Sequence, residues 1–234
     1  MSKTYVQGRW WEKKFYLHAL DRANLILEEG RTLALVGKSG SGKTTLALCA
    51  ALLEVPDSGK IWFYGRDTLS LDKQERALLR PRIQIIFQDS IALPARYTAK
   101  QIIEEPLLIQ HRHSAKERAE LVAALMEEVG LPSKWGNRFA NQFSGGQRQR
   151  LAIARSLTLQ PTLLILDEPF IGLDASTRAK LINLLTEQQA QRSLTYLYIS
   201  HDLESVRYFA DSVAVMDQGA IVQQASVSDL FPNS

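Results

Sequence analysis

Four runs of apolar and β-branched residues punctuate the chain, and each ends at a turn or at the start of a helix-like segment. Helix-like segments also separate the runs from one another. This alternation predicts an α/β fold in which a parallel sheet is covered by helices. The four strand-like runs are residues 32–36, 83–87, 162–166 and 195–200.

Two other segments have the pattern of antiparallel strands. Residues 58–67 read as short strands punctuated by Gly59 and Gly65. Residues 211–224 read as a hairpin that turns at Gly219. We therefore expect an antiparallel β portion in addition to the parallel sheet.

The composition becomes helical between residues 90 and 143. Ser114 and Glu117 have the spacing of a capping box, and Gly130 and Pro132 mark the end of the helix that follows. The apolar face of this helix consists of Leu121, Val122, Leu125, Met126 and Val129. We predict one domain, 1–234, in which a helical lobe (roughly 90–159) is inserted into an α/β core (1–89 and 160–234).

Composition narrows the class of protein. The chain has 234 residues, 45% of them apolar, and its 28 basic and 25 acidic residues are nearly balanced, so no nucleic-acid partner is implied. The longest apolar run, 46–53, is far shorter than the ~20 residues that cross a bilayer. The start lacks a secretion signal. We expect a cytosolic chain, with its single cysteine, Cys49, as a small buried residue.

A phosphate-binding motif follows the first strand-like run. Residues 37–44 satisfy G-x-x-x-x-G-K-[ST] and lead directly into a helix-like segment. The glycines allow backbone N–H groups to turn toward a phosphate, Lys43 adds a positive charge, and Thr44 offers its hydroxyl to Mg²⁺. In this setting a merely flexible Gly/Ser loop is the weaker interpretation. The predicted nucleotide-binding residues here are Gly37, Lys38, Ser39, Gly40, Ser41, Gly42, Lys43, Thr44 and Thr45.

Two acids end the third strand-like run. Asp167 and Glu168 follow the apolar stretch 163–166, and ligands bind at such strand ends in parallel sheets. Asp167 can hold Mg²⁺ through water, while Glu168 can orient and polarise an attacking water. Beside a phosphate loop, we favour this interpretation over that of a solvated strand end.

A third motif, "FSGGQRQR" at residues 143–150, opens a helix-like segment about twenty residues before Asp167. A serine and two glycines at a helix N-terminus form another anion cradle. With these motifs the chain resembles the ATP-binding subunits of ABC transporters, whose signature usually begins with Leu where this chain has Phe143. The resemblance covers nearly the whole chain and implies a P-loop NTPase (RecA-like) core.

The resemblance implies roles for further residues. Two subunits would dimerise head to tail around two ATP molecules, with the signature of one contacting the γ-phosphate held by Lys43 of the other. Gln88 would contact Mg²⁺ and water, His201 the γ-phosphate, and Asp174 the dimer interface. The signature residues acting in trans are Ser144, Gly145, Gly146 and Gln147.

The adenine base would stack on an aromatic residue upstream of the phosphate loop. The opening "SKTY" resembles the end of the family's first strand, which favours Tyr5. Most of that strand is then missing from this sequence, so its start is truncated or the strand is replaced. The competing aromatics are Trp10, Trp11, Phe15 and Tyr16.

Within the family, the chain is most similar to the ATP-binding subunits of peptide and nickel importers, through the stretches "IIFQDSIALPARYTAKQIIEEPL" and "QFSGGQRQRLAIARSL". Pro94 and Pro106 bound an apolar segment in the first of these. We expect Ile102 and Leu107 to pack in the core of the lobe. The groove that would receive a permease helix is predicted from Ile91, Leu93 and Tyr97.

Two functions remain in competition. One is the motor of an ABC importer on the cytoplasmic face of the membrane, with a second ATPase subunit, permease subunits and, indirectly, a substrate-binding protein as partners. The other is a soluble ABC ATPase acting on nucleic acid, ribosomes or an enzyme complex. Long coiled-coil heptads and a second nucleotide motif are absent from this sequence, which favours the motor and ATP with Mg²⁺ as its ligands.

Overall fold

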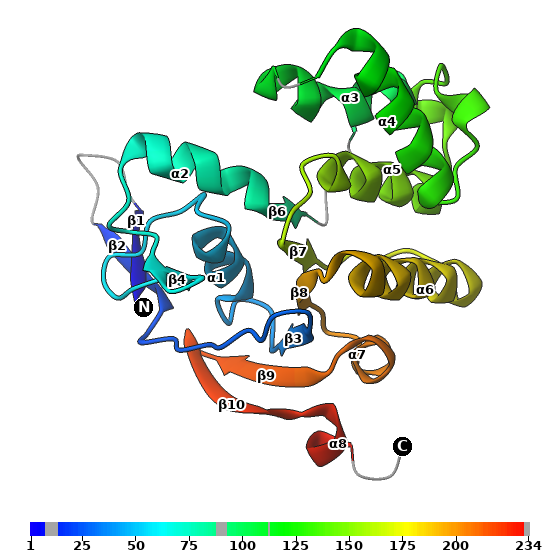
Figure 1. Ribbon diagram of the computed structural model, residues 1–234. Helices are drawn as coiled ribbons and strands as arrows, with labels where there is room; N and C mark the ends of the chain where they lie inside the picture. The colour runs from blue at the N-terminus through cyan, green and yellow to red at the C-terminus, as the bar shows by residue number, and fades with distance from the viewer. Residues whose placement is uncertain (8–13, 88–92, 112, 232–234) are drawn as a thin grey trace.

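The computed structural model describes residues 1–7, 14–87, 93–111 and 113–231. Among these residues, six strands form one central sheet in the order β10-β9-β3-β8-β7-β6 (Figure 1). The strands of this sheet are β3 (Thr32–Val36), β6 (Ile83–Ile86), β7 (Leu163–Asp167), β8 (Thr195–Ile199), β9 (Ser212–Asp217) and β10 (Ala220–Ser226).

The four predicted strands are confirmed, and they are parallel. β3 pairs with β8, β8 with β7 and β7 with β6, all in parallel register. The predicted hairpin at Gly219 is also present as β9 and β10. It is not a separate antiparallel unit, however, because β9 pairs in parallel with β3 and so extends the central sheet.

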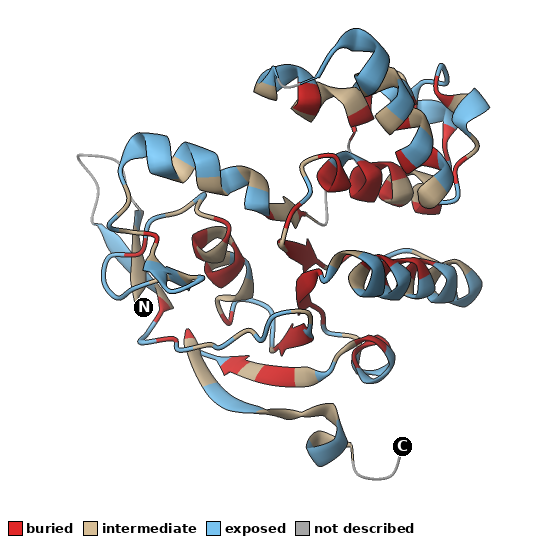
Figure 2. Cartoon of the chain, viewed as in Figure 1, coloured by how far each residue is buried: buried red, intermediate tan, exposed pale blue. Residues whose placement is uncertain are grey.

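Alternate residues of the central strands face two different helical layers. Leu33 and Leu35 pack with Leu46 of the phosphate-loop helix, whereas Ala34 and Val36 belong to the cluster on the opposite face. The strands are therefore buried on both faces, as Figure 2 shows, and they read as continuous apolar runs in the sequence. The helices of the α/β core are α1 (Lys43–Ala50), α2 (Lys73–Leu79), α6 (Ala175–Arg192), α7 (Leu203–Phe209) and α8 (Val227–Leu230).

Three helices lie between β6 and β7 in sequence and pack together next to the edge of the sheet formed by β6 (Figure 1). The capping box predicted at Ser114 is confirmed, and Val122, Leu125 and Met126 of the same helix are buried. The helices are α3 (Ala99–Gln110), α4 (Ala115–Glu128) and α5 (Gly145–Leu157). Short 3₁₀ turns occur at Arg80–Arg82, Ser133–Trp135 and Ala140–Gln142.

The prediction of an exposed apolar groove in the segment preceding α3 is partly wrong. Leu93 was expected to be exposed, but it is only 9% accessible and belongs to the apolar cluster that contains the lobe. Tyr97 is 42% exposed, as predicted, and Ile91 lies outside the described residues. Ile102 and Leu107 are buried, so their assignment to the core is confirmed. Pro106, at one end of the apolar stretch in the sequence, lies inside α3.

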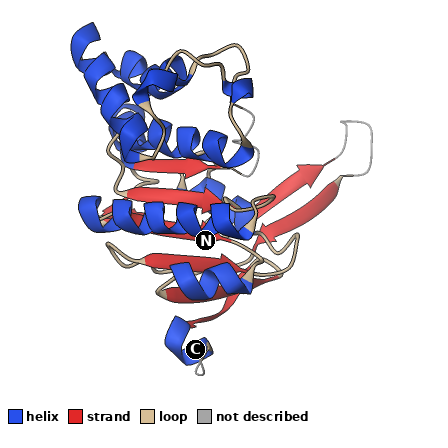
Figure 3. Ribbon diagram, turned by 90° about the vertical axis from the view of Figure 1, so that its right-hand side faces the viewer, coloured by secondary structure: helices blue, strands red, loops and turns tan. Residues whose placement is uncertain are grey.

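Two short antiparallel pairs complete the fold. β1 (Lys3–Gln7) pairs with β2 (Phe15–Leu20), and β4 (Trp62–Phe63) pairs with β5 (Arg66–Asp67). In Figure 3, β1 and β2 form the ribbon that projects from the body of the molecule and ends in the grey trace of residues 8–13. β2 returns to the core at Leu20, which is buried with the residues of α1.

Two expectations drawn from the composition concern the burial of Cys49 and the presence of membrane-spanning helices. Cys49 is fully buried in α1, and desolvation raises the pKa of its thiol to about 11. A protonated, inaccessible thiol is a packing residue, as predicted. Within the described ranges, every helix is too short or too polar to span a bilayer.

Candidate active site at the carboxyl edge of the sheet

Three neighbouring strands of the sheet carry the predicted chemistry at the same edge. The phosphate loop follows β3, Asp167 ends β7, and His201 follows β8 by two residues. β8 lies between β3 and β7 in the sheet order. Because these strands are parallel, their carboxyl ends meet at one edge, and side chains more than 120 residues apart in sequence come into contact there.

Close backbone packing shapes the phosphate loop. Gly42, the residue before α1, has a φ of +106°, and a Cβ atom there would overlap the carbonyl oxygen of Ala19. At Gly37 a Cβ atom would overlap the carbonyl oxygen of Met216. Lys43 Nζ donates hydrogen bonds to the carbonyl oxygens of Gly37 and Lys38, at 2.8 and 2.9 Å. The lysine ammonium is thus folded back over the loop.

Ser41 is a buried hydroxyl that has no partner in the described part of the chain. Its side chain belongs to a residue only 4% exposed, and its Oγ makes no hydrogen bond. An unpaired buried hydroxyl costs free energy, and such groups mark places where a ligand or water completes the site. A phosphate oxygen supplies the acceptor that this hydroxyl lacks, so the loop fits a nucleotide phosphate.

The loop is joined to the carboxylate strand through Thr44. Its Oγ1 donates to Oδ2 of Asp167 at 3.3 Å. Asp167 is 7% exposed, and desolvation raises the pKa of its carboxyl, with the neighbouring Glu168 charge acting in the same direction. A hydroxyl and a destabilised buried carboxylate side by side are oxygen ligands of the type that Mg²⁺ prefers. The donor set therefore fits that cation.

Glu168 and His201 form a second contact at the same edge. His201 Nδ1 lies 2.8 Å from Oε1 of Glu168, across the ends of β7 and β8. Glu168 has a φ of +52°, a conformation that is uncommon for residues other than glycine. Its backbone N–H donates to the carbonyl oxygen of Ile199 at 3.0 Å, which fixes this turn against β8. The strained turn directs the carboxylate toward His201.

A group that sequence reasoning missed holds the His201 loop in place. Arg178 of α6 forms an ion pair with Asp202, whose carboxylate also accepts the N–H of Glu204 and so caps α7. Behind this loop, the buried hydroxyls of Tyr198 and Ser205 are hydrogen-bonded at 2.6 Å. Arg178 and Ser205 belong to no motif that we recognised in the sequence, and only the fold brings Arg178 to Asp202.

The predicted signature forms the start of α5. Ser144 caps this helix by accepting the N–H of Gln147, and the Gln147 side chain accepts the N–H of Ser144 in return. The two glycines differ in their surroundings. A Cβ atom on Gly146 would lie 2.5 Å from Cγ2 of Thr177 in α6, whereas a Cβ atom on Gly145 would meet nothing within 4 Å. Gly145 is therefore the one that borders open space.

Two other predicted site residues, Asp174 and Tyr5, take no part in these contacts. Asp174 caps α6 by accepting from Thr177, through both the backbone N–H and the hydroxyl. Tyr5 lies in β1 opposite Leu17, with the Lys3 ammonium 5.4 Å from its ring centroid. Gln88 lies outside the described residues. Among the described residues, no hydrogen bond or ion pair joins the start of α5 to the phosphate loop.

Comparison with known proteins shows to which class of phosphate-binding proteins the chain belongs. The sequence profile of the ABC transporter family matches residues 20–171, which include the phosphate loop, the α5 signature and Glu168. The chain belongs to the ABC transporter family. It thus contains an ATP-binding domain of the ATP-hydrolysing class, and the predicted P-loop fold is confirmed.

Curated ABC relatives are similar over most of this chain. The dipeptide transport ATP-binding protein DppF of Haemophilus influenzae is 44% identical over 235 residues, which cover all of this chain and 72% of that protein. DppF of Escherichia coli is 44% identical and the oligopeptide transport protein AppF of Bacillus subtilis 42% identical, each over 92% of this chain. The chain spans 65% and 66% of the lengths of these two relatives.

Solved ABC cassettes share the fold. A dimeric post-hydrolysis state of the ATP-binding cassette MJ0796, bound to ADP and Pi, aligns with a TM-score of 0.84 and 30% identity, over 97% of this chain and 96% of that one. The protein cbiO1 from Clostridium perfringens, part of an ABC transporter complex, aligns with a TM-score of 0.84 and 26% identity, over 99% of this chain and 90% of that one.

The free-energy cost of burying the charged Asp167 carboxylate gives a prediction about the stability of the fold. Because burial raises the pKa of this carboxyl, its ionisation at neutral pH opposes folding. We expect Asp167→Asn, measured without nucleotide and in EDTA, to melt at a higher temperature than the unmodified chain at pH 7.5, by about 2–4 °C for each kcal/mol relieved.

The direction of the Asp167 pKa shift determines how the stability difference between the variant and the unmodified chain depends on pH. The folded pKa lies above the ordinary value of 3.8, so the advantage of the variant should decline as pH falls through the folded pKa and vanish below 3.8, where the carboxyl is protonated in both states. Thermal melts across this pH range measure it. A variant that is less stable at pH 7.5, or a difference independent of pH, would contradict the assignment.

Proposed function

We propose that this chain is the ATP-hydrolysing subunit of a peptide importer and that it works on the cytoplasmic face of the membrane. The observation that carries the proposal is the meeting of Thr44 with Asp167 and of Glu168 with His201 at one edge of the sheet. The similarity to DppF and AppF, which are named as peptide transport proteins, supports the substrate class. Because these relatives are named for peptide transport, we propose peptide as the substrate class.

The phosphate loop binds the nucleotide in this proposal. Lys43 exchanges its two carbonyl acceptors for phosphate oxygens, and Ser41 gains the acceptor that it lacks. Thr44 and Asp167 hold Mg²⁺, together with Gln88. When bound, the cation neutralises phosphate charge and stabilises the leaving group. Tyr5 is proposed as the platform for adenine.

Glu168 acts on the water that attacks the γ-phosphate. Its carboxylate lies beside the metal ligands but is held by His201 rather than by the phosphate loop. In the nucleotide complex the carboxylate turns to the water, and His201 is then free to donate to the γ-phosphate. Arg178 and Asp202 hold the loop that carries His201 and thereby set the position of its ring.

A second subunit supplies the other half of each site. In the proposed dimer, Ser144, Gly145 and Gln147 at the start of α5 face the γ-phosphate held by the partner, and Asp174 lies in the interface. The dimeric state of the MJ0796 cassette with ADP and Pi supports this arrangement. Gly146 faces the same γ-phosphate in this proposal, and it also lets α5 approach α6, because a Cβ atom there would lie 2.5 Å from Cγ2 of Thr177.

The lobe connects this chemistry to the membrane. Tyr97 is exposed next to the start of α3, and we propose that it contributes to the surface that receives a permease helix. The transport relatives favour this role over that of a soluble ABC ATPase on nucleic acid or ribosomes. A pulldown from native membranes, analysed by mass spectrometry, tests the proposed function directly through the permease that it recovers.

The prediction for Glu168 separates ATP turnover from nucleotide binding. Glu168→Gln keeps the shape of the side chain but removes the base, so we expect ATP hydrolysis to fall by roughly 10²–10⁴ while nucleotide affinity changes little. Steady-state phosphate release and binding of a fluorescent nucleotide measure the two quantities. Near-normal hydrolysis by the purified variant would remove Glu168 from the proposed role.

The prediction for Gly145 tests whether the start of α5 faces the γ-phosphate that the partner subunit binds. Gly145→Asp adds a carboxylate where there is free space within the subunit, so the monomer should fold and bind ATP normally. Repulsion from the partner's γ-phosphate should then prevent ATP-driven dimerisation, measured by light scattering in the Glu168→Gln background. Gly145→Asn is the matched uncharged control. If the Asp variant dimerises as well as the Asn variant, the start of α5 does not face a phosphate.

The prediction for the helical lobe compares the exposed Tyr97 with the buried Leu93. Tyr97→Asp should leave folding and soluble ATPase activity unchanged but reduce co-purification with the permease and peptide uptake, because the side chain is exposed. Leu93→Asp should instead unfold the lobe, since it buries a charge in the apolar cluster. Melting temperature, ATPase rate and uptake are compared in both variants. Normal uptake by Tyr97→Asp would place the coupling surface elsewhere.

A further inference from the structure

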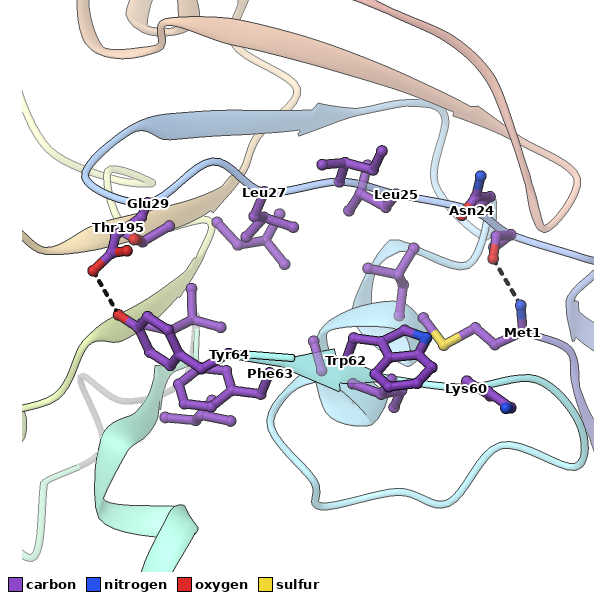
Figure 4. Close-up of a pocket in the computed structure, with 18 of the residues that line it drawn as sticks. Met1, Asn24, Leu25, Leu27, Glu29, Lys60, Trp62, Phe63, Tyr64 and Thr195 are labelled. Carbon is purple, nitrogen blue, oxygen red and sulfur yellow. Dashed lines mark hydrogen bonds between the residues drawn. The ribbon is translucent and has the colours of Figure 1, made fainter. Parts of the chain in front are cut away.

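A pocket of about 630 Å³ lies at the end of the sheet away from the phosphate loop, and Figure 4 shows side chains that line it. Two charged groups at this pocket already have partners. The Tyr64 hydroxyl donates to the Glu29 carboxylate at 2.9 Å, and the Lys60 ammonium lies 5.4 Å from the centroid of the Trp62 ring. The helical lobe differs, because cations gather there without any acid among them.

The start of α3 with the residues before it (94–100) and the turn before α5 (133–142) form a surface that is basic and aromatic. Neither segment contains an aspartate or a glutamate. We call this the basic surface of the lobe. Its exposed basic and aromatic side chains are Arg96, Tyr97, Lys100, Lys134, Arg138 and Phe139.

Backbone hydrogen bonds join the two segments of the basic surface. The Ala140 N–H donates to the carbonyl oxygen of Tyr97 at 3.1 Å, and the Lys100 N–H donates to the carbonyl oxygen of Gly136 at 2.9 Å. Because these peptide groups pair with each other, a partner of this surface meets side chains rather than a free strand edge. Recognition therefore rests on the charges and rings of the side chains.

The cations of the basic surface have no carboxylate partner. In the part of the chain that the structure describes, no ion pair includes Arg96, Lys100, Lys134 or Arg138. Elsewhere on the lobe, by contrast, Arg118 pairs with Glu104 at 2.9 Å. Beside the surface, the Glu127 carboxylate already accepts the Ser133 N–H at 2.6 Å. The positive charge that is left without a counter-charge favours an anionic partner.

Aromatic rings lie among these cations. The Tyr97 side chain is 42% exposed and that of Phe139 47% exposed. The Arg138 guanidinium lies 4.2 Å from the centroid of the Trp135 ring, so a ring also supports one of the cations. At a membrane surface, cations pair with lipid phosphates while aromatic rings enter the boundary between headgroups and acyl chains. The side chains of the basic surface offer both kinds of contact.

We propose that the basic surface binds the anionic headgroups of a phospholipid membrane directly. Charge complementarity selects the headgroup, since four cations face outward without a counter-charge. Tyr97 belongs to this surface and is also the proposed contact for a permease helix, so one orientation of the chain presents both contacts to the membrane. The lipid contact rests on the proposed location at the membrane but requires neither a permease nor a peptide.

The basic surface leads directly into the signature. The ring centroids of Trp135 and Phe143 are 6.2 Å apart, and the Phe139 N–H donates to Oε1 of Gln142 at 2.8 Å. Phe143 is buried, and Ser144 follows it as the cap of α5. Headgroup binding therefore restrains the segment that positions the start of α5. We expect this restraint as slower hydrogen exchange in the segment, without a change at the phosphate loop.

Sedimentation of the purified full chain with vesicles tests the contact. We expect binding to an equal mixture of phosphatidylglycerol and phosphatidylcholine, release by added salt, and little binding to phosphatidylcholine alone. Each cation near an anionic surface strengthens the partition by about fivefold, so Lys100→Gln/Lys134→Gln/Arg138→Gln should bind about a hundredfold more weakly. Exchange of lysine for arginine and of arginine for lysine at the same three positions keeps the charges and should preserve binding.

A matched control removes the same charge from exposed cations outside the lobe. The variant Arg66→Gln/Lys73→Gln/Lys180→Gln has the same net charge as the lobe variant and should lose about fivefold in binding at most. Melting temperature and soluble ATPase rate check that every variant is folded. In the unmodified chain, anionic vesicles should slow hydrogen exchange by at least about tenfold at residues 97–100 and 133–142.

Several outcomes would overturn the lipid contact. Equal losses in the lobe variant and the control would show that only net charge matters, and slowed exchange outside the basic surface would place the contact elsewhere. Absence of vesicle binding, together with loss of permease co-purification in the lobe variant, would assign the surface to an acidic protein segment. The importer proposal fails separately, because a pulldown without a permease would leave the vesicle result unchanged.

Discussion

The hydrogen bond between Thr44 and Asp167 depends on a single constraint, the parallel pairing of β3, β8 and β7. Parallel strands deliver their carboxyl ends to one edge, so a loop after β3 and an acid at the end of β7 meet without any local sequence relationship. β8 lies between them and adds His201 to the same edge. If this register shifted by one residue, the buried faces of all three strands would be exchanged and the site would be lost.

The same constraint explains what could be predicted. The strands around Leu35, Ile165 and Leu197 are buried on both faces, so each produces an unbroken apolar run that is visible in sequence. The phosphate loop and the Asp167–Glu168 pair follow such runs directly, and their positions could be predicted for that reason. Capping boxes such as that of Ser114 are also local and were found correctly.

The failures occurred where packing, rather than local pattern, decides the outcome. Leu93 lies in an irregular segment that has no periodicity to show which way a side chain points, and it turned inward while Tyr97 remained exposed. Pro106 gives no indication in the sequence of the helix around it, yet α3 continues through it, with the buried Ile103 and Leu107 on either side. The ion pair of Arg178 with Asp202 joins two helices and has no sequence signal at all.

α1 connects the phosphate loop to the apolar core on one face of the sheet. At its start, the turn at Gly42 lies close against Ala19 of β2, and further along the helix Leu46, Ala47 and Cys49 are buried in the apolar cluster. The helix is only eight residues long, so its own hydrogen bonds contribute little and its stability comes from packing. Loss of packing at one end is therefore transmitted along the helix to the loop at the other. The burial of α1 thus determines how rigidly Lys43 and Thr44, at its start, are presented to a nucleotide.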